Sequence, residues 1–252
     1  MLSNEEIISA VRRSDQAMCE QIATWEPLEY GVAFCCPEMP SFAGANQLRD
    51  VWLADMDGET AFSRAEAYYA ERALICHRWT PASGQAADPV DALLTGKGWR
   101  RVDTLAMGMK DWDAAVATDD DSVRVLPARA MRRAYGKTFE GDSADLAAGV
   151  ERLNDGNHDA FVCTLDGEPA GRAAYVEVGD IARLADVFVL PAFRRRGVGR
   201  ALVGRFLQLA RRLSPKSVVA SCESSDATGR AFLERYGFAK CGTLSAFERI
   251  DE

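Results

Sequence analysis

The sequence predicts an α/β protein, because strand-like apolar runs alternate with helical patterns along its 252 residues. The clearest strand is residues 187–190, Val-Phe-Val-Leu, a β-branched and aromatic run. Pro191 ends it, since proline has no N–H to donate to a sheet. Apolar residues then recur every three or four positions through 198–209, which predicts a helix. Asp166-Gly167, between two further apolar runs, predicts a β-hairpin.

The first half of the chain shows the same alternation. A helix over 5–24 is expected to begin after Ser3-Asn4, a pair suited to capping a helix N-terminus. The elements expected after it are strands over 30–36 and 48–54, helices over 60–73 and 90–95, and an apolar run over 102–109. The segment 111–121 is acidic and without periodicity, which makes it the best candidate for a linker.

The second half is expected to begin with a strand over 123–127, followed by helical stretches within 128–153. The hairpin strands are expected over 160–165 and 170–178, ahead of the strand 187–190 and its helix. The last expected elements are a strand over 217–222, a helix over 228–236 and a strand over 243–250. The linker divides the chain into two predicted domains, residues 1–115 and 122–252.

Composition excludes several classes of protein. Hydrophobic residues at 48% and charged residues at 27% are ordinary for a globular protein. No apolar run approaches the roughly 20 residues that span a bilayer, and the acidic N-terminus is unlike a signal peptide. Seven scattered cysteines without a Cys-x-x-Cys pair, and only two histidines, indicate neither a disulfide framework nor a metal site. We therefore expect a reduced, cytoplasmic protein with no membrane partner.

The net charge of −8 is unevenly distributed. Residues 1–121 carry 10 Lys and Arg against 21 Asp and Glu, a net charge of −11, whereas residues 122–252 carry 20 against 17, a net charge of +3. The basic side chains that stand together, Arg194, Arg195 and Arg196, lie in the second half. Because the chain as a whole repels phosphate polymers, nucleic acid is not expected as a partner.

Arginines and two glycines lie between the strand 187–190 and the helix that follows it. Gly197 and Gly199 would let a ligand approach the backbone closely. The first turn of a helix also leaves N–H groups unpaired at the positive end of the helix dipole, which favours a phosphate or pyrophosphate. The pattern is not a Walker A loop, which needs Lys-Ser or Lys-Thr, nor a dinucleotide fingerprint, since Leu202 stands where the third glycine belongs. The alternative is a turn whose arginines simply face water.

The string Val-x-Pro-x-x-Arg-x-x-Gly-x-Gly-x-x-Leu, from Val189 to Leu202, resembles the cofactor-binding motif of the GNAT N-acetyltransferase superfamily. The resemblance covers residues 122–252 and implies a GNAT-like α/β fold with a mixed sheet and acetyl-CoA as co-substrate. It implies that the backbone of 187–189 pairs with the pantetheine arm, that the amides of 195–200 hold the pyrophosphate, and that strand 217–222 splays from 187–189. The cofactor-binding residues so implied are Val187, Phe188, Val189, Arg194, Arg195, Arg196, Gly197, Val198, Gly199, Arg200 and Asp226.

A short internal repeat suggests that the first half is related to the second. Residues 92–105 align with 231–244 without a gap, so that Gly98 meets Gly237 and Trp99 meets Phe238. Chance similarity between two helix-to-strand corners is the alternative. If the repeat is real, residues 1–115 are a degenerate GNAT-like domain that lacks the Arg-x-x-Gly-x-Gly motif and would wall the acceptor site or stiffen the second half.

The groups that would move protons are less clear than the cofactor site. The tyrosine that many GNAT members use as general acid corresponds here to Leu233, and the asparagine at the start of that helix corresponds to Asp226. The candidates for the general base are Glu223 and Glu177, and Asp186 lies on the central strand. For each of the three, a solvated or structural carboxylate is the alternative. Tyr236 has the spacing of a core residue.

Two classes of function remain open from the sequence. The first is an N-acetyltransferase that moves the acetyl group of acetyl-CoA to a primary amine of a small molecule or protein. The second is a non-catalytic acyl-CoA-binding or regulatory module, which the missing tyrosine favours. The intact arginine-glycine stretch favours the enzyme. The sequence leaves the acceptor and the oligomeric state open.

Overall fold

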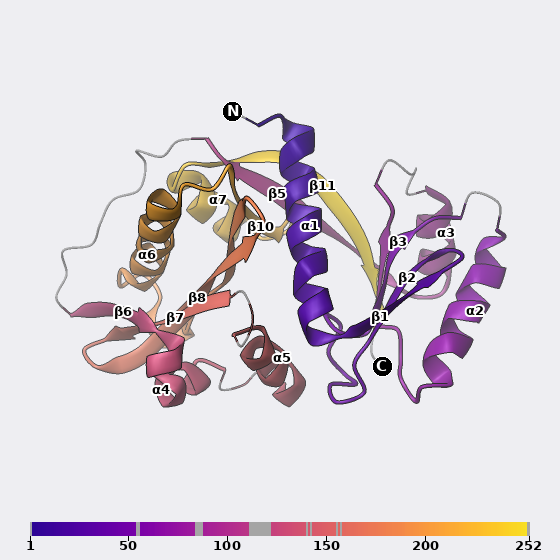
Figure 1. Cartoon of the computed structure of the whole chain (residues 1–252), viewed down its shortest axis with the longest axis horizontal. Helices are drawn as coiled ribbons and strands as arrows, with labels where there is room; N and C mark the ends of the chain where they lie inside the picture. Colours follow the sequence, from indigo (N-terminus) through magenta and orange to yellow (C-terminus); the bar gives the residue numbers. More distant parts are fainter. Residues whose placement is uncertain are drawn as a thin grey trace.

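The structure is a computed structural model that describes residues 2–53, 56–83, 88–110, 122–139, 141, 143–154, 156 and 158–250. The expected linker at 111–121 lies outside the described residues. Within them, the strands form one mixed eleven-stranded sheet in the order β1-β2-β3-β4-β11-β5-β10-β9-β8-β7-β6 (Figure 1). None of the helices among these residues has the length and apolar character needed to cross a membrane.

The first half of the chain supplies α1 (Asn4–Ile22), β1 (Thr24–Leu28), β2 (Gly31–Cys35), β3 (Gln47–Val51), α2 (Gly58–Ala70), β4 (Arg78–Pro81), α3 (Asp88–Gly96) and β5 (Arg100–Met109). Helix α1 begins with a capping box, in which the Ser3 hydroxyl accepts from the Glu6 N–H while the Glu6 carboxylate accepts from the Ser3 N–H. This satisfies backbone donors that the first turn would otherwise leave unpaired.

The second half supplies β6 (Val123–Pro127), η1 (Ala128–Ala130), α4 (Arg132–Lys137), α5 (Ala144–Asn154), β7 (His158–Leu165), β8 (Glu168–Val178) and β9 (Ile181–Val189). After these come η2 (Pro191–Phe193), α6 (Val198–Leu213), β10 (Ser217–Glu223), α7 (Ala227–Arg235) and β11 (Phe238–Glu248). The expected mixed α/β architecture is thereby confirmed.

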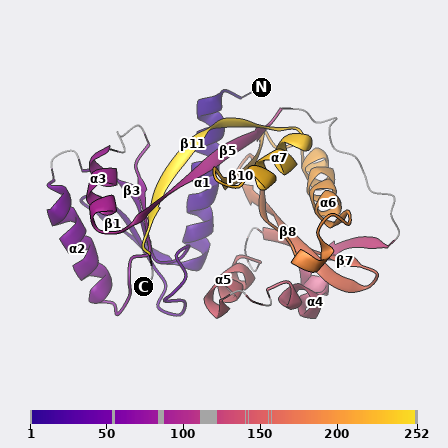
Figure 2. The ribbon, with the colours of Figure 1, turned by 180° about the vertical axis from the view of Figure 1, so that it is seen from behind.

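The two halves exchange their last strands. Strand β5 lies between β10 and β11, and the end of β11 pairs with β4, so the C-terminal strand joins the sheet of the first half. The end of β11 accordingly lies beside the first-half strands in both views (Figures 1 and 2). The exchange follows from the sheet order and could not be deduced from where each strand begins and ends.

The internal repeat has a structural counterpart. Helix α3 is followed by Gly98 at φ 79°, Trp99 and β5, and α7 is followed by Gly237 at φ 87°, Phe238 and β11. In the antiparallel pair β5·β11, Thr104 faces Leu244 and Leu105 faces Thr243. The two segments of the repeat are therefore direct neighbours in the sheet, and each has the same order of helix, glycine at positive φ, aromatic residue and strand.

Helix α1 joins the two halves. It runs across the middle of the molecule, between the helices of the first half and those of the second (Figure 1). Its buried residues Ile7, Ala10 and Val11 share one apolar cluster with Ala106 of β5 and Val219 of β10. The helix thus covers the part of the sheet where the strands are exchanged, and its C-terminal end reaches the second half.

Removal of the Phe247 ring is expected to destabilise the protein strongly. Phe247 on β11 is fully buried, pairs with Trp79, and belongs to the apolar core of the first half. We expect Phe247→Ala to lower the free energy of unfolding by about 3–5 kcal/mol, measured by urea denaturation. The milder Phe247→Leu should be used if the alanine variant does not fold. The control is Trp52→Ala, whose side chain is exposed; equal losses in both would contradict the role of β11 in that core.

Candidate functional site

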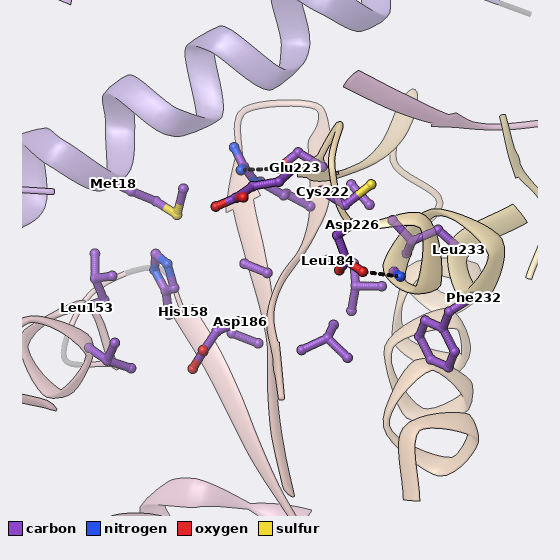
Figure 3. Close-up of a pocket in the computed structure, with 18 of the residues that line it drawn as sticks. Met18, Leu153, His158, Leu184, Asp186, Cys222, Glu223, Asp226, Phe232 and Leu233 are labelled. Atoms are coloured by element: carbon purple, nitrogen blue, oxygen red, sulfur yellow. Dashed lines mark hydrogen bonds between the residues drawn. The ribbon is translucent and has the colours of Figure 1, made fainter. Parts of the chain in front are cut away.

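Strands β9 and β10 pair for only part of their length. They are parallel neighbours from Ile181–Leu184 opposite Ser217–Ala220, although β9 continues to Val189 and β10 to Glu223. A cavity of about 520 Å³ lies where the pairing stops. Its walls come from the two strand ends, from α7 and α5, and from Met18 on α1 (Figure 3). The splaying implied by the resemblance is therefore present in the structure.

A bulge bends β9 at this point. Asp186 has a φ of 48°, and the register between β8 and β9 shifts between Arg172 and Ala174. The Asp186 carboxylate accepts from Nε of the buried Arg172 at 2.8 Å. The Arg172 guanidinium lies 3.8 Å from the ring centroid of Phe139 and 4.6 Å from that of Phe188, and it also donates to the Thr138 carbonyl. This buried arginine holds the bulge, and with it the direction in which the end of β9 runs.

The arginine-glycine stretch forms the loop between β9 and α6. Gly197 precedes α6 with a φ of 85°, a conformation that favours glycine, and no side chain caps the helix. A Cβ placed on Gly197 would meet nothing within 4 Å, so the space in front of the first turn is open. The side chains of Arg194, Arg195, Arg196 and Arg200 are exposed around it. An uncapped helix N-terminus with open space and adjacent guanidinium groups fits a diphosphate.

The candidate carboxylates lie in different places. Glu223 ends β10, lines the cavity and accepts from the Ser225 hydroxyl at 3.3 Å. Asp226 also lines the cavity, but its carboxylate caps α7 by accepting from the Gly229 N–H at 2.8 Å. Glu177 is exposed near the end of β8, opposite Ala182, and is not among the residues that line the cavity. The structure thus brings Glu223, and not Glu177, to the place where β9 and β10 separate.

The side of the cavity formed by α7 is apolar. Phe232 and Leu233 line it, and Leu233 occupies the position of the tyrosine that many GNAT members carry (Figure 3). Tyr236, one turn farther along, is buried and lies edge-on to Phe232 with ring centroids 5.0 Å apart. It packs in the core, as its spacing predicts, and burial raises the pKa of its hydroxyl.

Two buried basic side chains of the cavity were not found from the sequence. His158 begins β7, is 4% exposed, and has no hydrogen-bond partner on either ring nitrogen among the residues that the structure describes. Arg183 on β9 donates to the Ser14 hydroxyl at 2.8 Å, to the Ser221 hydroxyl at 2.9 Å and to the Asp15 carboxylate. Neither residue stands in a recognisable motif, so no spacing in the sequence could have identified them.

His158 is expected to make stability depend on pH. Burial, with a contribution from Arg183, lowers the pKa of His158 from 6.5 to about 4. Between these two values the unfolded chain binds the proton and the folded chain does not, so stability rises with pH in this window and the effect is complete above 6.5. We expect His158→Leu to reduce the pH dependence of the free energy of unfolding between pH 4 and 6.5, by about 1.4 kcal/mol per pH unit. Denaturation at a series of pH values measures this, and an unchanged slope would contradict it.

The first half of the chain contributes to the cavity wall. Met18 of α1 lines it directly. Helix α5, which brings Val150, Leu153 and Asn154 to the cavity, is tied to the first half because Arg152 donates to the Ile22 carbonyl at 3.0 Å. The hydroxyl and N–H of Ser41 both donate to Asp145 at the other end of α5. The wall opposite α7 therefore depends on contacts between the two halves.

Comparison with known proteins relates the second half to acetyltransferases. Residues 128–238 match the family described as Acetyltransferase (GNAT) family. An uncharacterized N-acetyltransferase of Methanocaldococcus jannaschii is 29% identical over 97 residues, which are 36% of this chain and 43% of that protein. The match thus spans less than half the length of that relative.

Solved structures share the fold over a longer part of the chain. A GCN5-related N-acetyltransferase from Kribbella flavida superposes with a TM-score of 0.63 at 15% identity, covering 97% of this chain and 96% of that one. A tandem GNAT protein from the clavulanic acid biosynthesis pathway gives a TM-score of 0.54 at 14% identity, covering 76% of this chain and 69% of that one. At these identities the likeness concerns the fold alone.

Proposed function

We propose that the C-terminal half of this chain, in which residues 128–238 match the GNAT acetyltransferase family, transfers the acetyl group of acetyl-CoA to a primary amine of a small molecule or protein. The observation that carries the proposal is the cavity at the separation of β9 and β10, with the open N-terminus of α6 following β9 directly. One strand end thus leads from a site suited to a diphosphate to a cavity suited to a reacting group.

The chain's own residues would hold the co-substrate along this path. The backbone of Val187, Phe188 and Val189 would pair with the pantetheine arm, since β9 no longer pairs with β10 there. The loop from Arg194 to Arg200 would hold the diphosphate with backbone N–H groups and guanidinium groups. Acetyl-CoA, when bound, supplies the activated acetyl thioester. Asp226 would contribute indirectly, because its carboxylate caps the N-terminus of α7, the helix that forms one side of the cavity.

Glu223 is the proposed general base. It lines the cavity at the end of β10, where it would accept the proton that the attacking amine loses. Leu233 has no proton to give to the departing thiolate, so we propose that this proton comes from water. The C–N bond forms at the thioester carbonyl and the C–S bond breaks. The proton held by Glu223 then neutralises the hydroxide left when water protonates the thiolate, so the products are the amide and the free thiol.

The second candidate function is a non-catalytic acyl-CoA-binding or regulatory module. The apolar side chain of Leu233 at the cavity favours it, because a group that could protonate the leaving thiolate is missing there. Release of free thiol from acetyl-CoA in the presence of a panel of primary amines tests the two. Thiol release that depends on the amine supports the enzyme, and tight binding of coenzyme A without release supports the module.

We propose that residues 1–115 form a degenerate GNAT-like domain and that 122–252 form the catalytic one. Helix α2 occupies the place in the first half that α6 occupies in the second, after a strand and before the next parallel strand. Its N-terminus is capped by Asp57, whose carboxylate accepts from the Thr60 N–H at 3.0 Å. A carboxylate at this position would repel a phosphate, so the first half would serve to wall the cavity. All seven cysteines are free thiols, which supports our proposal of a cytoplasmic protein.

A further inference from the structure

A second cavity adjoins the one between β9 and β10. It measures about 200 Å³ and lies between α4 and α5, lined by Tyr135 and Phe139 among others. Asn154, at the end of α5, lines both cavities. The two cavities therefore share Asn154 as a common wall residue, with Tyr135 in the smaller one and His158 in the larger one.

Three polar side chains around this junction are buried without partners. His158 is 4% exposed, Tyr135 7% and Asn154 9%. Within the described ranges, both ring nitrogens of His158, the Tyr135 hydroxyl and the Asn154 Oδ1 atom have no hydrogen-bond partner. Burial raises the pKa of the Tyr135 hydroxyl, and the nearby Asn154 side chain partly offsets this by a hydrogen-bond interaction. By distance and angle, however, neither Tyr135 Oη nor Asn154 Oδ1 has a full hydrogen bond to a described residue. Burying such groups unpaired is costly, so a bound group that pairs with them would be stabilised at this place.

The chemistry of these groups selects the ligand. A neutral imidazole has one donor and one acceptor, a phenol can do both, and Oδ1 of an amide only accepts. A hydroxyl group both donates and accepts, so it can satisfy each of them. A carboxylate cannot donate to Oδ1, and an ammonium group cannot accept from the phenol.

The charged residues near the junction are either exposed or paired with a residue of opposite charge. Arg129 donates to the Asn154 backbone carbonyl at 2.7 Å. Arg132 and Glu151, which also line the smaller cavity, are exposed and of opposite sign. Asp186 is paired with Arg172, and Arg183 with Asp15. Arg129, Arg132 and Glu151 thus leave one positive charge, but all three side chains are exposed, whereas Tyr135, Asn154 and His158 are buried.

We propose that the junction of the two cavities, formed by Tyr135, Asn154 and His158, binds a hydroxyl group of the acceptor, so that the substrate is a primary amine that carries one or more hydroxyl groups. This inference rests on the proposed function, since it assigns the acceptor of the same site. The inference goes beyond the proposed function because it assigns the choice of acceptor to side chains that the acyl transfer itself does not need.

The experiment compares cyclohexylamine with its 2-, 3- and 4-hydroxylated derivatives, which share the ring and the amine. Binding of each to the protein saturated with coenzyme A is measured by calorimetry, and thiol release from acetyl-CoA is measured separately. At least one hydroxylated amine is expected to bind about tenfold more tightly than cyclohexylamine. Tyr135→Phe and Asn154→Leu are each expected to reduce this preference to less than about threefold.

Tyr175→Phe is the matched control. It also removes a buried phenol hydroxyl without a partner, but Tyr175 packs against Phe206 in the core under α6. It should leave the preference unchanged. Equal binding of all four amines to the unaltered protein, or an equal loss of preference in Tyr175→Phe, would overturn the subsite. If a hydroxylated amine binds more tightly than cyclohexylamine but no thiol is released, the result supports the subsite and contradicts the acetyltransferase. If thiol is released but all four amines bind equally, the result supports the acetyltransferase and contradicts the subsite.

Discussion

Gly197→Glu is expected to weaken the binding of coenzyme A by about 100-fold or more. The substitution places a side chain at a φ of 85°, where only glycine is unstrained, and puts a carboxylate into the open space before the first turn of α6. A carboxylate at the N-terminus of α6 would interact with the positive end of the helix dipole, which is where the diphosphate is proposed to bind. Calorimetric titration with coenzyme A measures the effect directly.

The matched control separates the loss of the site from backbone strain. Gly179, in the turn between β8 and β9, also has a positive φ, of 59°, and a Cβ there meets nothing within 4 Å. Gly179→Glu therefore introduces the same side chain and similar strain away from α6. It should bind coenzyme A normally. If both variants lose binding equally, or if Gly197→Glu retains it, α6 is not the diphosphate site.

Glu223→Gln is expected to lower the rate of acetyl transfer by about 10²- to 10⁴-fold while coenzyme A still binds. The amide has nearly the shape of the carboxylate but cannot accept the amine proton, so the loss should lie in kcat and in the acidic limb of the pH–rate profile. Steady-state kinetics with an amine that is turned over, together with calorimetry, measures both.

Glu177→Gln is the informative comparison. Because Glu177 is exposed on β8 and does not line the cavity, we expect Glu177→Gln to change the rate of acetyl transfer by less than about threefold. If Glu177→Gln lost most of the acetyl-transfer rate while Glu223→Gln stayed active, Glu177 and not Glu223 would be the general base. Full activity of both variants would mean that the attacking amine loses its proton to water.

Much of the fold was predictable, and the failures have physical causes. The strands 30–36, 48–54 and 102–109 and the helix 60–73 correspond to β2, β3, β5 and α2 within a few residues. Strand β1 was missed because it is an edge strand containing Pro27, with mostly exposed side chains and hence no apolar alternation. Strand β4 was missed because it has only four residues and ends at Pro81. The final strand β11 begins at Phe238, five residues before the expected start, because its pairing with β5 continues to the turn after α7.

The residues of the site also divide into those that the sequence predicted and those that it did not. The arginine-glycine loop was predictable because its residues are consecutive, and consecutive residues fix a local shape: a strand end, a turn at positive φ and an uncapped helix. Met18, Asn154, His158 and Arg183 come from four elements separated by up to 165 positions and meet only through packing. The domain boundaries at 115 and 122 stay a prediction, and the roles of the individual site residues do as well.

What the sequence alone determined is therefore local: the alternation of helices and strands, the arginine-glycine loop, and a repeat at an offset of 139 residues. Only the tertiary structure decided that β5 and β11 change places, that α1 and α5 close one side of the cavity, and that Glu223 rather than Glu177 lies beside it. Short-range patterns fix backbone conformation, because each residue restricts its near neighbours. The contacts that shape a cavity depend on which distant strands pair, and the free energy of that choice is spread over the whole core.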